Sequence, residues 1–200
     1  AKYYNKWDLW TISVDGTNEK LLLEDACWGT WRPSGDEIVF ARGDKAYTMK
    51  LDSKEPVMIL DGSAAIKDGT IVQQPQLSPD GKYLAATLRG TSRETGIYDL
   101  ENKTWTTTGA GCQINWLPSG NEVVRMNPTG NGGTAAPSEV LLIPVENGKP
   151  TVNVRKIKDM RLMDLPERRR SHEYFPIFDQ TGTWMVWCAT DEGHDHDIYD

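Results

Sequence analysis

A turn centred on glycine occurs four times along this chain, and each turn precedes a short run of apolar residues. The four turn glycines are Gly35, Gly81, Gly120 and Gly182. They lie about 40 to 60 residues apart, which is close to the repeat length of β-propeller blades that contain several strands each. This internal repeat limits the possible fold more strongly than any single residue does.

The turns have residue types that are typical of a tight hairpin. Proline restricts φ at the start of the first three turns and is missing from the fourth, at residues 179–182, whereas glycine accepts the positive φ that closes all four. The residues that we expect to form these structural turns are Pro33, Gly35, Pro79, Asp80, Gly81, Pro118, Gly120 and Gly182. The runs on either side are rich in Trp, Tyr, Ile, Val and Leu, which favour β-strands. Each copy therefore predicts a β-hairpin.

A second hairpin is expected after each of the first three copies. Third strands are expected over residues 46–52, 96–102 and 140–148, and fourth strands over residues 57–60, 104–107 and 152–154. Two hairpins in series make one four-stranded antiparallel blade of a propeller. The three complete blades are expected over about residues 27–61, 72–109 and 112–158.

The two ends of the sequence resemble parts of blades. Residues 7–24 look like a third and a fourth strand, and residues 172–200 look like a first and a second strand followed by the start of a third. Residues 1–200 would then form a single all-β propeller domain with three complete blades and partial blades at both ends. One alternative is a closed four-bladed ring whose ends share a blade, which leaves no sheet edge exposed. The other is a fragment of a larger propeller, which we favour because residues 8–10 and 197–199 supply the same kind of strand.

The turn at residues 78–81 reads Ser-Pro-Asp-Gly, and Pro75 and Pro176 stand at equivalent places before two of the turns. In these features the repeat resembles the TolB-like (WD-repeat-like) β-propeller family, over nearly the whole chain. The resemblance implies a propeller fold that presents loops and a central funnel. Because that family is largely exported, the resemblance also implies a periplasmic or extracellular location and a role in a cell-envelope or extracellular assembly.

The charge of the chain bears on its partners. The formal net charge is −7, which argues against nucleic acid as the main partner. Arg168, Arg169 and Arg170 are a local exception, in the long insertion between the third and fourth copies. They are interpreted either as part of a solvated surface segment or as a docking patch for an acidic partner. No apolar run is long enough to form a transmembrane segment.

One segment has residues that bind metals. His194, Asp195, His196 and Asp197 follow one another near the end of the sequence. Alternate residues of an extended segment point the same way, so that His194 and His196 would share a face and could hold a divalent metal such as Zn²⁺ or Mn²⁺. The alternative is a solvated hairpin loop. No other cofactor is indicated.

The tryptophans and cysteines are expected to be structural. Packing between the sheets is the main interpretation for Trp7, Trp10, Trp28, Trp31, Trp105, Trp116, Trp184 and Trp187. A role of one or two of them in binding a sugar or a peptide is the alternative. Cys27, Cys112 and Cys188 are expected to be buried free thiols, although one disulfide with a spare cysteine is also open.

The sequence contains none of the common enzyme motifs. Neither a Gly-x-Ser-x-Gly elbow, nor a His-Glu-x-x-His motif, nor a phosphate-binding glycine loop occurs. We therefore expect a non-catalytic scaffold that binds a protein or a peptide. Two alternatives remain: a propeller-type hydrolase or lyase, for which a metal held by His194 and His196 would speak, and the gating propeller of a larger peptidase.

Overall fold

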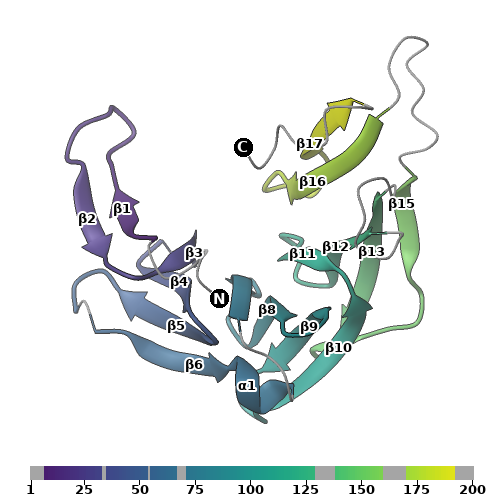
Figure 1. Cartoon of the computed structure of the whole chain (residues 1–200), viewed down its shortest axis with the longest axis horizontal. Coiled ribbons are helices and arrows are strands. Elements are labelled where there is room, and N and C mark those ends of the chain that lie inside the picture. Colours follow the sequence, from purple (N-terminus) through teal and green to yellow (C-terminus); the bar gives the residue numbers. More distant parts are fainter. Residues whose placement is uncertain are drawn as a thin grey trace.

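The protein is an all-β chain whose antiparallel sheets follow one another around an arc (Figure 1). The computed structural model describes residues 7–32, 35–53, 55–66, 71–128, 138–159 and 170–191. Within these ranges, three complete sheets are flanked by a two-stranded hairpin at each end of the arc. This arrangement confirms the expected fold class, a propeller of four-stranded blades with partial blades at both ends.

The first and second sheets are simple meanders of four strands each. The first consists of β3 (Cys27–Trp31), β4 (Glu37–Arg42), β5 (Lys45–Lys50) and β6 (Val57–Asp61). The second consists of β7 (Ile71–Leu77), β8 (Tyr83–Arg89), β9 (Arg93–Asp99) and β10 (Thr104–Ala110). In both sheets the turn glycine lies between the first two strands, where the tight turn needs a residue that accepts positive φ.

The third sheet has a divided outer strand. Its main strands are β11 (Cys112–Trp116), β12 (Glu122–Pro128) and β13 (Ser138–Glu146). The outer edge of β13 pairs with β14 (Lys149–Pro150) at one end and with β15 (Arg155–Asp159) at the other. The expected fourth strand at residues 152–154 is therefore wrong. A tight turn at Asn147 and Gly148, both with positive φ, makes the short β14, and the chain then leaves the sheet edge before β15 rejoins it.

The hairpins at the two ends of the arc are separate two-stranded sheets. One consists of β1 (Leu9–Thr11) and β2 (Lys20–Leu23), and the other of β16 (Arg170–Phe178) and β17 (Met185–Asp191). Among the described residues, no strand ladder joins one hairpin to the other, so that the described strands do not form the closed four-bladed ring.

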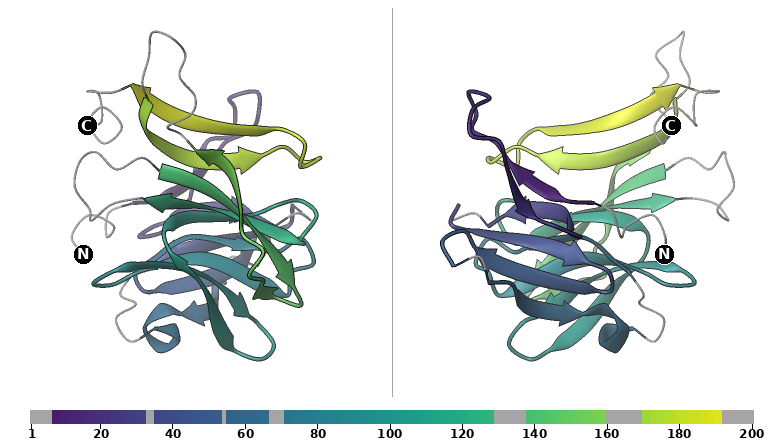
Figure 2. Two further views of the ribbon diagram at one scale, coloured as in Figure 1. Left: turned by 90° about the vertical axis from the view of Figure 1, so that its right-hand side faces the viewer. Right: turned by 60° about the vertical axis from the view of Figure 1, so that its left-hand side comes forward.

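Successive sheets pack face to face, as the side views show (Figure 2). Alternate residues of a strand point to opposite faces of its sheet. Ile38 and Phe40 of β4 therefore pack towards β1 and β2, whereas Val39 and Ala41 pack towards the second sheet. Similar apolar clusters join the second sheet to the third and the third to β16 and β17. The core of the protein thus lies between the sheets.

The tryptophans do not all pack between sheets. Trp116 is buried, and Trp28 and Trp105 are half-buried against the core that joins the first two sheets. The exposed tryptophans are Trp7, Trp10, Trp31 and Trp184. For these four the expected packing is wrong, because Trp10 and Trp184 belong to the end hairpins, whose outer faces no described sheet covers. The Trp187 side chain lies outside the described structure.

One short helix, α1 (Gly62–Ala65), connects the first sheet to the second. It was not expected from the sequence. Asp61 caps its start, because the Asp61 carboxylate accepts hydrogen bonds from the backbone N–H groups of Ser63 and Ala64. No helix in the described part of the chain is long and apolar enough to cross a membrane.

Candidate functional site

The first strand of each sheet lies on the concave side of the arc (Figure 1). We call β3, β7, β11 and β16 the inner strands. Neighbouring inner strands contact one another in chain order, β3 with β7, β7 with β11, and β11 with β16. The inner strands therefore bring together the three complete sheets and the β16–β17 hairpin.

Each complete sheet has the same irregularity in its inner strand. The pairing with the second strand shifts between Cys27 and Thr30 in β3, and at the same place in β7 and β11. Inside the shift stands a residue with positive φ: Trp28 (58°), Gln74 (53°) and Gln113 (57°). Residues other than glycine rarely adopt this conformation, and β-bulges of this kind are common beside functional sites. The backbone of the inner strands is thus bent three times in the same way.

Side chains of the inner strands join adjacent sheets by hydrogen bonds. Thr30 Oγ1 donates to the Pro75 carbonyl oxygen at 3.0 Å. The Trp116 backbone N–H donates to Gln76 Oε1 at 2.6 Å. Asn115 Nδ2 donates to the Pro176 carbonyl oxygen at 3.3 Å. Thr30, Gln76 and Asn115 all stand two residues after the bulge, so the repeat places a polar side chain where it can bond to the next sheet.

The inner strands of the three complete sheets are neutral. The strands β3, β7 and β11 contain no Asp, Glu, Lys, Arg or His. Their half-buried polar side chains include Thr30, Gln74, Gln76 and Asn115. Amide side chains donate and accept hydrogen bonds at once, which is the capacity that a peptide backbone complements. This surface is suited to binding polar, uncharged groups.

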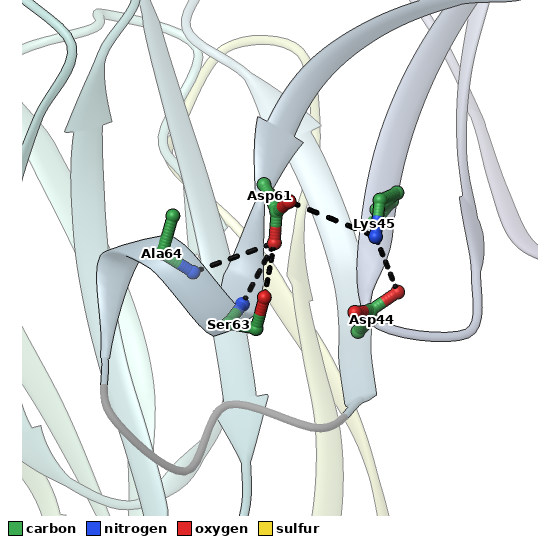
Figure 3. A network of polar contacts seen from close by, with 5 residues as sticks. All are labelled: Asp44, Lys45, Asp61, Ser63 and Ala64. Atoms are coloured by element: carbon green, nitrogen blue, oxygen red, sulfur yellow. Dashed lines mark hydrogen bonds and ion pairs between the residues drawn. The ribbon is translucent and has the colours of Figure 1, made fainter.

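A second polar region lies where the first sheet leads into α1 (Figure 3). Lys45 Nζ lies 3.0 Å from Asp44 Oδ1 and 3.6 Å from Asp61 Oδ2. Asp61 Oδ1 accepts hydrogen bonds from the Ser63 hydroxyl at 2.6 Å and from its backbone N–H at 3.1 Å. The Ser63 hydrogen bond is the main cause that lowers the pKa of Asp61, and Lys45 adds to it. The network fixes the start of α1, which connects the first sheet to the second, against the β4–β5 turn.

A third polar cluster joins the second sheet to the third. The Arg125 guanidinium is buried and donates a hydrogen bond to the Ala110 carbonyl oxygen. Burial lowers the pKa of Arg125, and the nearby Glu139 opposes this effect. Burial also raises the pKa of the Cys112 thiol, against the influence of the Arg93 and Arg125 guanidinium groups. The cluster holds the connection between β10 and β11 in place.

The described cysteines are free. Cys27 and Cys112 are both buried and form no disulfide. Burial raises the pKa of Cys27 to about 11. A thiol with so high a pKa stays protonated at neutral pH and is a poor nucleophile. Neither side chain therefore resembles a catalytic cysteine.

Most of the charged residues proposed from the sequence lie outside the described residues. This holds for the metal-binding candidates His194, Asp195, His196 and Asp197, and for Arg168 and Arg169. Arg170 is the first residue of β16 and stands opposite Asp191 in the pairing, but its side chain is not described. Within the described ranges, no group of three or more His, Cys, Asp or Glu residues is placed to hold a metal ion.

The four turn glycines all have positive φ. Gly35, Gly81, Gly120 and Gly182 have φ values of 77°, 72°, 73° and 70°. A Cβ atom at Gly120 would lie 3.4 Å from Pro79 Cδ, so the turns of the second and third sheets lie close together. Asp80 Oδ1 accepts hydrogen bonds from the Ser78 hydroxyl at 2.6 Å and the Lys82 N–H at 3.1 Å. Pro118 is exposed, and Pro33 lies outside the described residues.

Sequence reasoning missed the bulged residues Trp28, Gln74 and Gln113. A signal for them existed, because each stands seven positions before its turn glycine. Aligning the copies backwards from the glycines shows the repeated position. The Arg125 cluster had no such signal, since its members come from five different strands.

No known protein family matches the sequence, and no curated protein matches it. Solved structures do match. TolB from Acinetobacter baumannii superposes with a TM-score of 0.69 at 16% identity, over 95% of this chain and 45% of that chain. The putative TolB from Agrobacterium tumefaciens gives a TM-score of 0.63 at 17% identity, over 79% of this chain and 58% of that chain.

A protease domain shares the fold as well. The β-propeller domain of the Trilobed protease from Pyrococcus furiosus gives a TM-score of 0.54 at 12% identity, over 94% of this chain and 57% of that chain. This chain therefore spans about half the length of the solved proteins that it matches. At these identities the likeness shows the fold, and it confirms the expected TolB-like propeller at that level.

Proposed function

We propose that this TolB-like propeller is a non-catalytic scaffold that binds a protein or peptide segment along its inner strands. The observation that carries the proposal is the neutral, amide-rich surface of β3, β7 and β11, held in shape by hydrogen bonds between sheets. A rigid surface binds with a smaller loss of conformational entropy than a flexible one. Its polar groups suit the backbone and neutral side chains of a peptide.

The location and the assembly belong to the same proposal. Propellers with this fold include TolB proteins of two bacteria. We propose a periplasmic or extracellular location and a place in a cell-envelope or extracellular assembly. In such an assembly the inner strands bind the partner, and the basic residues Arg168, Arg169 and Arg170 contact its acidic side chains.

A selection experiment with a matched pair of variants tests the binding surface. Phage-displayed random peptides are selected on the purified chain, and the affinity of the enriched peptides is then measured by fluorescence anisotropy. Gln74→Gly removes one inner-strand amide and keeps a backbone that accepts positive φ. Asn147→Gly makes the same change at an exposed residue of the β13–β14 turn, which also has positive φ.

The two variants give distinct expected results. Loss of one hydrogen bond of about 1 kcal/mol weakens binding about five-fold, so we expect this loss for Gln74→Gly and no change for Asn147→Gly. Equal affinities of both variants and the unchanged chain would exclude the inner strands as the binding surface. Failure of any peptide to be enriched would also count against the proposal.

The gating propeller of a peptidase is the second candidate, and the match to the propeller domain of the Trilobed protease favours it. A gate admits many peptides, whereas a scaffold recognises one partner. The sequences of the selected peptides distinguish the two functions. A shared consensus motif supports the scaffold, and weak enrichment of unrelated peptides supports the gate.

A further inference from the structure

A row of polar side chains crosses the second sheet on the face towards the third. Thr87 of β8 stands opposite Thr95 of β9 on one side and opposite Gln73 of β7 on the other, and all three residues are buried. Thr87 stands two residues after Ala85, which packs in the core shared with the third sheet, so both point to the same face. The core between these two sheets therefore has a polar part as well as an apolar one.

Arg125 reaches this row from the third sheet. It stands two residues after Val123, which packs in the core shared with the second sheet, and its guanidinium donates to the Ala110 carbonyl oxygen. Thr95 Oγ1 donates to the Gly109 carbonyl oxygen at 2.9 Å, and a Cβ atom at Gly109 would lie 3.1 Å from Arg125 Nη2. The guanidinium and the threonine row thus meet where β10 ends.

The repeat shows that packing alone does not require polar residues at these places. Arg125 and Thr87 stand five and six residues after their turn glycines. At the same two places the other complete sheets have buried apolar residues, which are Phe40, Ala86, Ala41 and Met126. The polar pair is therefore a feature of the interface between the second and third sheets alone among the described complete sheets.

One group of each side chain has no hydrogen-bond partner in the described part of the chain. These groups are Arg125 Nε and Thr87 Oγ1, and the two residues are 7% and 0% exposed. The ion pairs of the described residues do not include Arg125. The nearby Glu139 carboxylate accepts a hydrogen bond from Asn127 Nδ2 at 3.2 Å instead. Burying a charge in this way is costly unless an opposite charge accompanies it.

We propose that a small inorganic anion, of the size and charge of chloride, binds between the second and third sheets at Arg125 and Thr87. The Arg125 Nε–H and the Thr87 hydroxyl both donate hydrogen bonds, and an anion accepts from both. Its charge neutralises the buried guanidinium, which a water molecule in the same place would not do. The complete burial of the two residues suits a single-atom anion rather than a peptide carboxylate. The anion thereby joins the two sheets beside the start of the inner strand β11.

Three variants test the site. Arg125→Met removes the guanidinium and places an apolar side chain where Phe40 and Ala86 stand in the other sheets. Thr87→Val removes the hydroxyl and keeps the shape of the side chain. Arg42→Met is the matched control, because the Arg42 guanidinium also donates to backbone carbonyl oxygens, those of residues 24 and 25, but at an exposed place. Circular dichroism first shows that each variant is folded.

Two measurements are then made. The thermal midpoint of unfolding is followed as sodium chloride replaces sodium gluconate at constant ionic strength, so that only the anion changes. An anion that binds the folded chain raises the midpoint as its concentration rises, and the dependence gives its affinity. Bromide, a heavier anion of similar size, is located in crystals of the chain by its anomalous X-ray scattering.

The proposal predicts a distinct result for each variant. Chloride raises the midpoint of the unchanged chain and of Arg42→Met, but not that of Arg125→Met. Thr87→Val loses one hydrogen bond to the anion and binds chloride about five-fold more weakly. Bromide lies within hydrogen-bond distance of Arg125 Nε and Thr87 Oγ1. Equal midpoints of the unchanged chain in both salts would overturn the proposal in favour of bound water. An unaltered chloride response in Arg125→Met or in Thr87→Val would overturn it as well, as would bromide found only elsewhere.

Discussion

Thr30 Oγ1 donates a hydrogen bond to the carbonyl oxygen of Pro75 at 3.0 Å, across 45 positions of sequence and from the first sheet to the second. Sheets of this fold are joined by packing rather than by strand ladders, so such a bond fixes the angle between neighbours. Asn115 makes the same contact with Pro176, from the third sheet to β16. The inner strands therefore hold the curvature of the arc as well as forming the candidate binding surface.

Replacing Thr30 by valine tests this role. Thr30→Val keeps the shape of the side chain and removes the hydroxyl donor, so that the carbonyl oxygen of the buried Pro75 loses this hydrogen bond. We expect the free energy of unfolding to fall by about 1 to 2 kcal/mol in urea denaturation. Thr104→Val, at an exposed strand position of β10, is the control and should change stability by less than about 0.5 kcal/mol. Equal effects of the two variants would mean that the bond between sheets adds no stability.

Alanine variants of two glycines distinguish the effect of backbone strain from the effect of steric overlap. Gly35 and Gly148 have φ values of 77° and 74°, but a Cβ atom meets nothing within 4 Å at Gly35, whereas at Gly148 it meets the Tyr83 ring. Alanine strains the backbone by about 1 kcal/mol at either position. Overlap with the rigid ring adds about 1 to 3 kcal/mol at Gly148. We therefore expect Gly148→Ala to have the lower thermal midpoint of the two, and a midpoint equal to that of Gly35→Ala would contradict the contact between the second and third sheets.

The fold was predictable from the sequence because the same turn-and-strand pattern occurs four times. A turn glycine with positive φ and a following apolar strand recur at Gly35, Gly81, Gly120 and Gly182, and any one copy is supported by the others. The divided edge strand of the third sheet was not predictable, because Val152 and Val154 are as apolar as true strand residues. Their exposure follows from the turn at Gly148 and from where β15 returns to β13, which depends on the folded sheet.

The candidate site was less predictable than the fold. Charged and metal-binding residues attract attention in a sequence, whereas the inner surface consists of neutral residues such as Gln74 and Asn115. Their importance comes from a bulge and from bonds to the next sheet, and neither follows from residue type alone. The tryptophans misled the sequence analysis in the opposite way. Trp10 and Trp31 are of a residue type that usually packs in a core, but they occupy positions that no described sheet covers.

The network at Asp61 predicts a dependence of stability on pH. The pKa of Asp61 is lower in the folded protein than in the unfolded chain, so its ionised form stabilises the fold at neutral pH. This contribution is lost as the pH falls below about 4. Asp61→Asn keeps an oxygen that can cap α1 but removes the charge. We expect the variant to be less stable than the unchanged chain at neutral pH and equally stable at acidic pH, in urea titrations at both values.

The control for Asp61 is another carboxylate of the same sheet. Asp52→Asn changes an exposed residue in the turn between β5 and β6, away from Lys45 and Ser63. It measures the effect of losing one negative charge elsewhere on the sheet, and the effect of Asp61→Asn is compared with it. A constant difference for Asp61→Asn at all pH values would show that its charge has no part in the stability.

The metal-binding prediction for His194 and His196 rests on the sequence, and a calorimetric titration decides it. If the two imidazoles with Asp195 and Asp197 hold a divalent ion, Zn²⁺ binds at about one equivalent per chain and His194→Ala removes the heat of binding. His172→Ala is the matched control, since it removes an imidazole from β16 and leaves the His194–Asp197 segment intact. Binding also requires neutral imidazole, so the affinity should fall as the pH drops below about 6. Absence of binding by the unchanged chain would remove the metal site, and with it the main support for a hydrolase or lyase. Equal binding by His194→Ala would place the metal elsewhere in the chain.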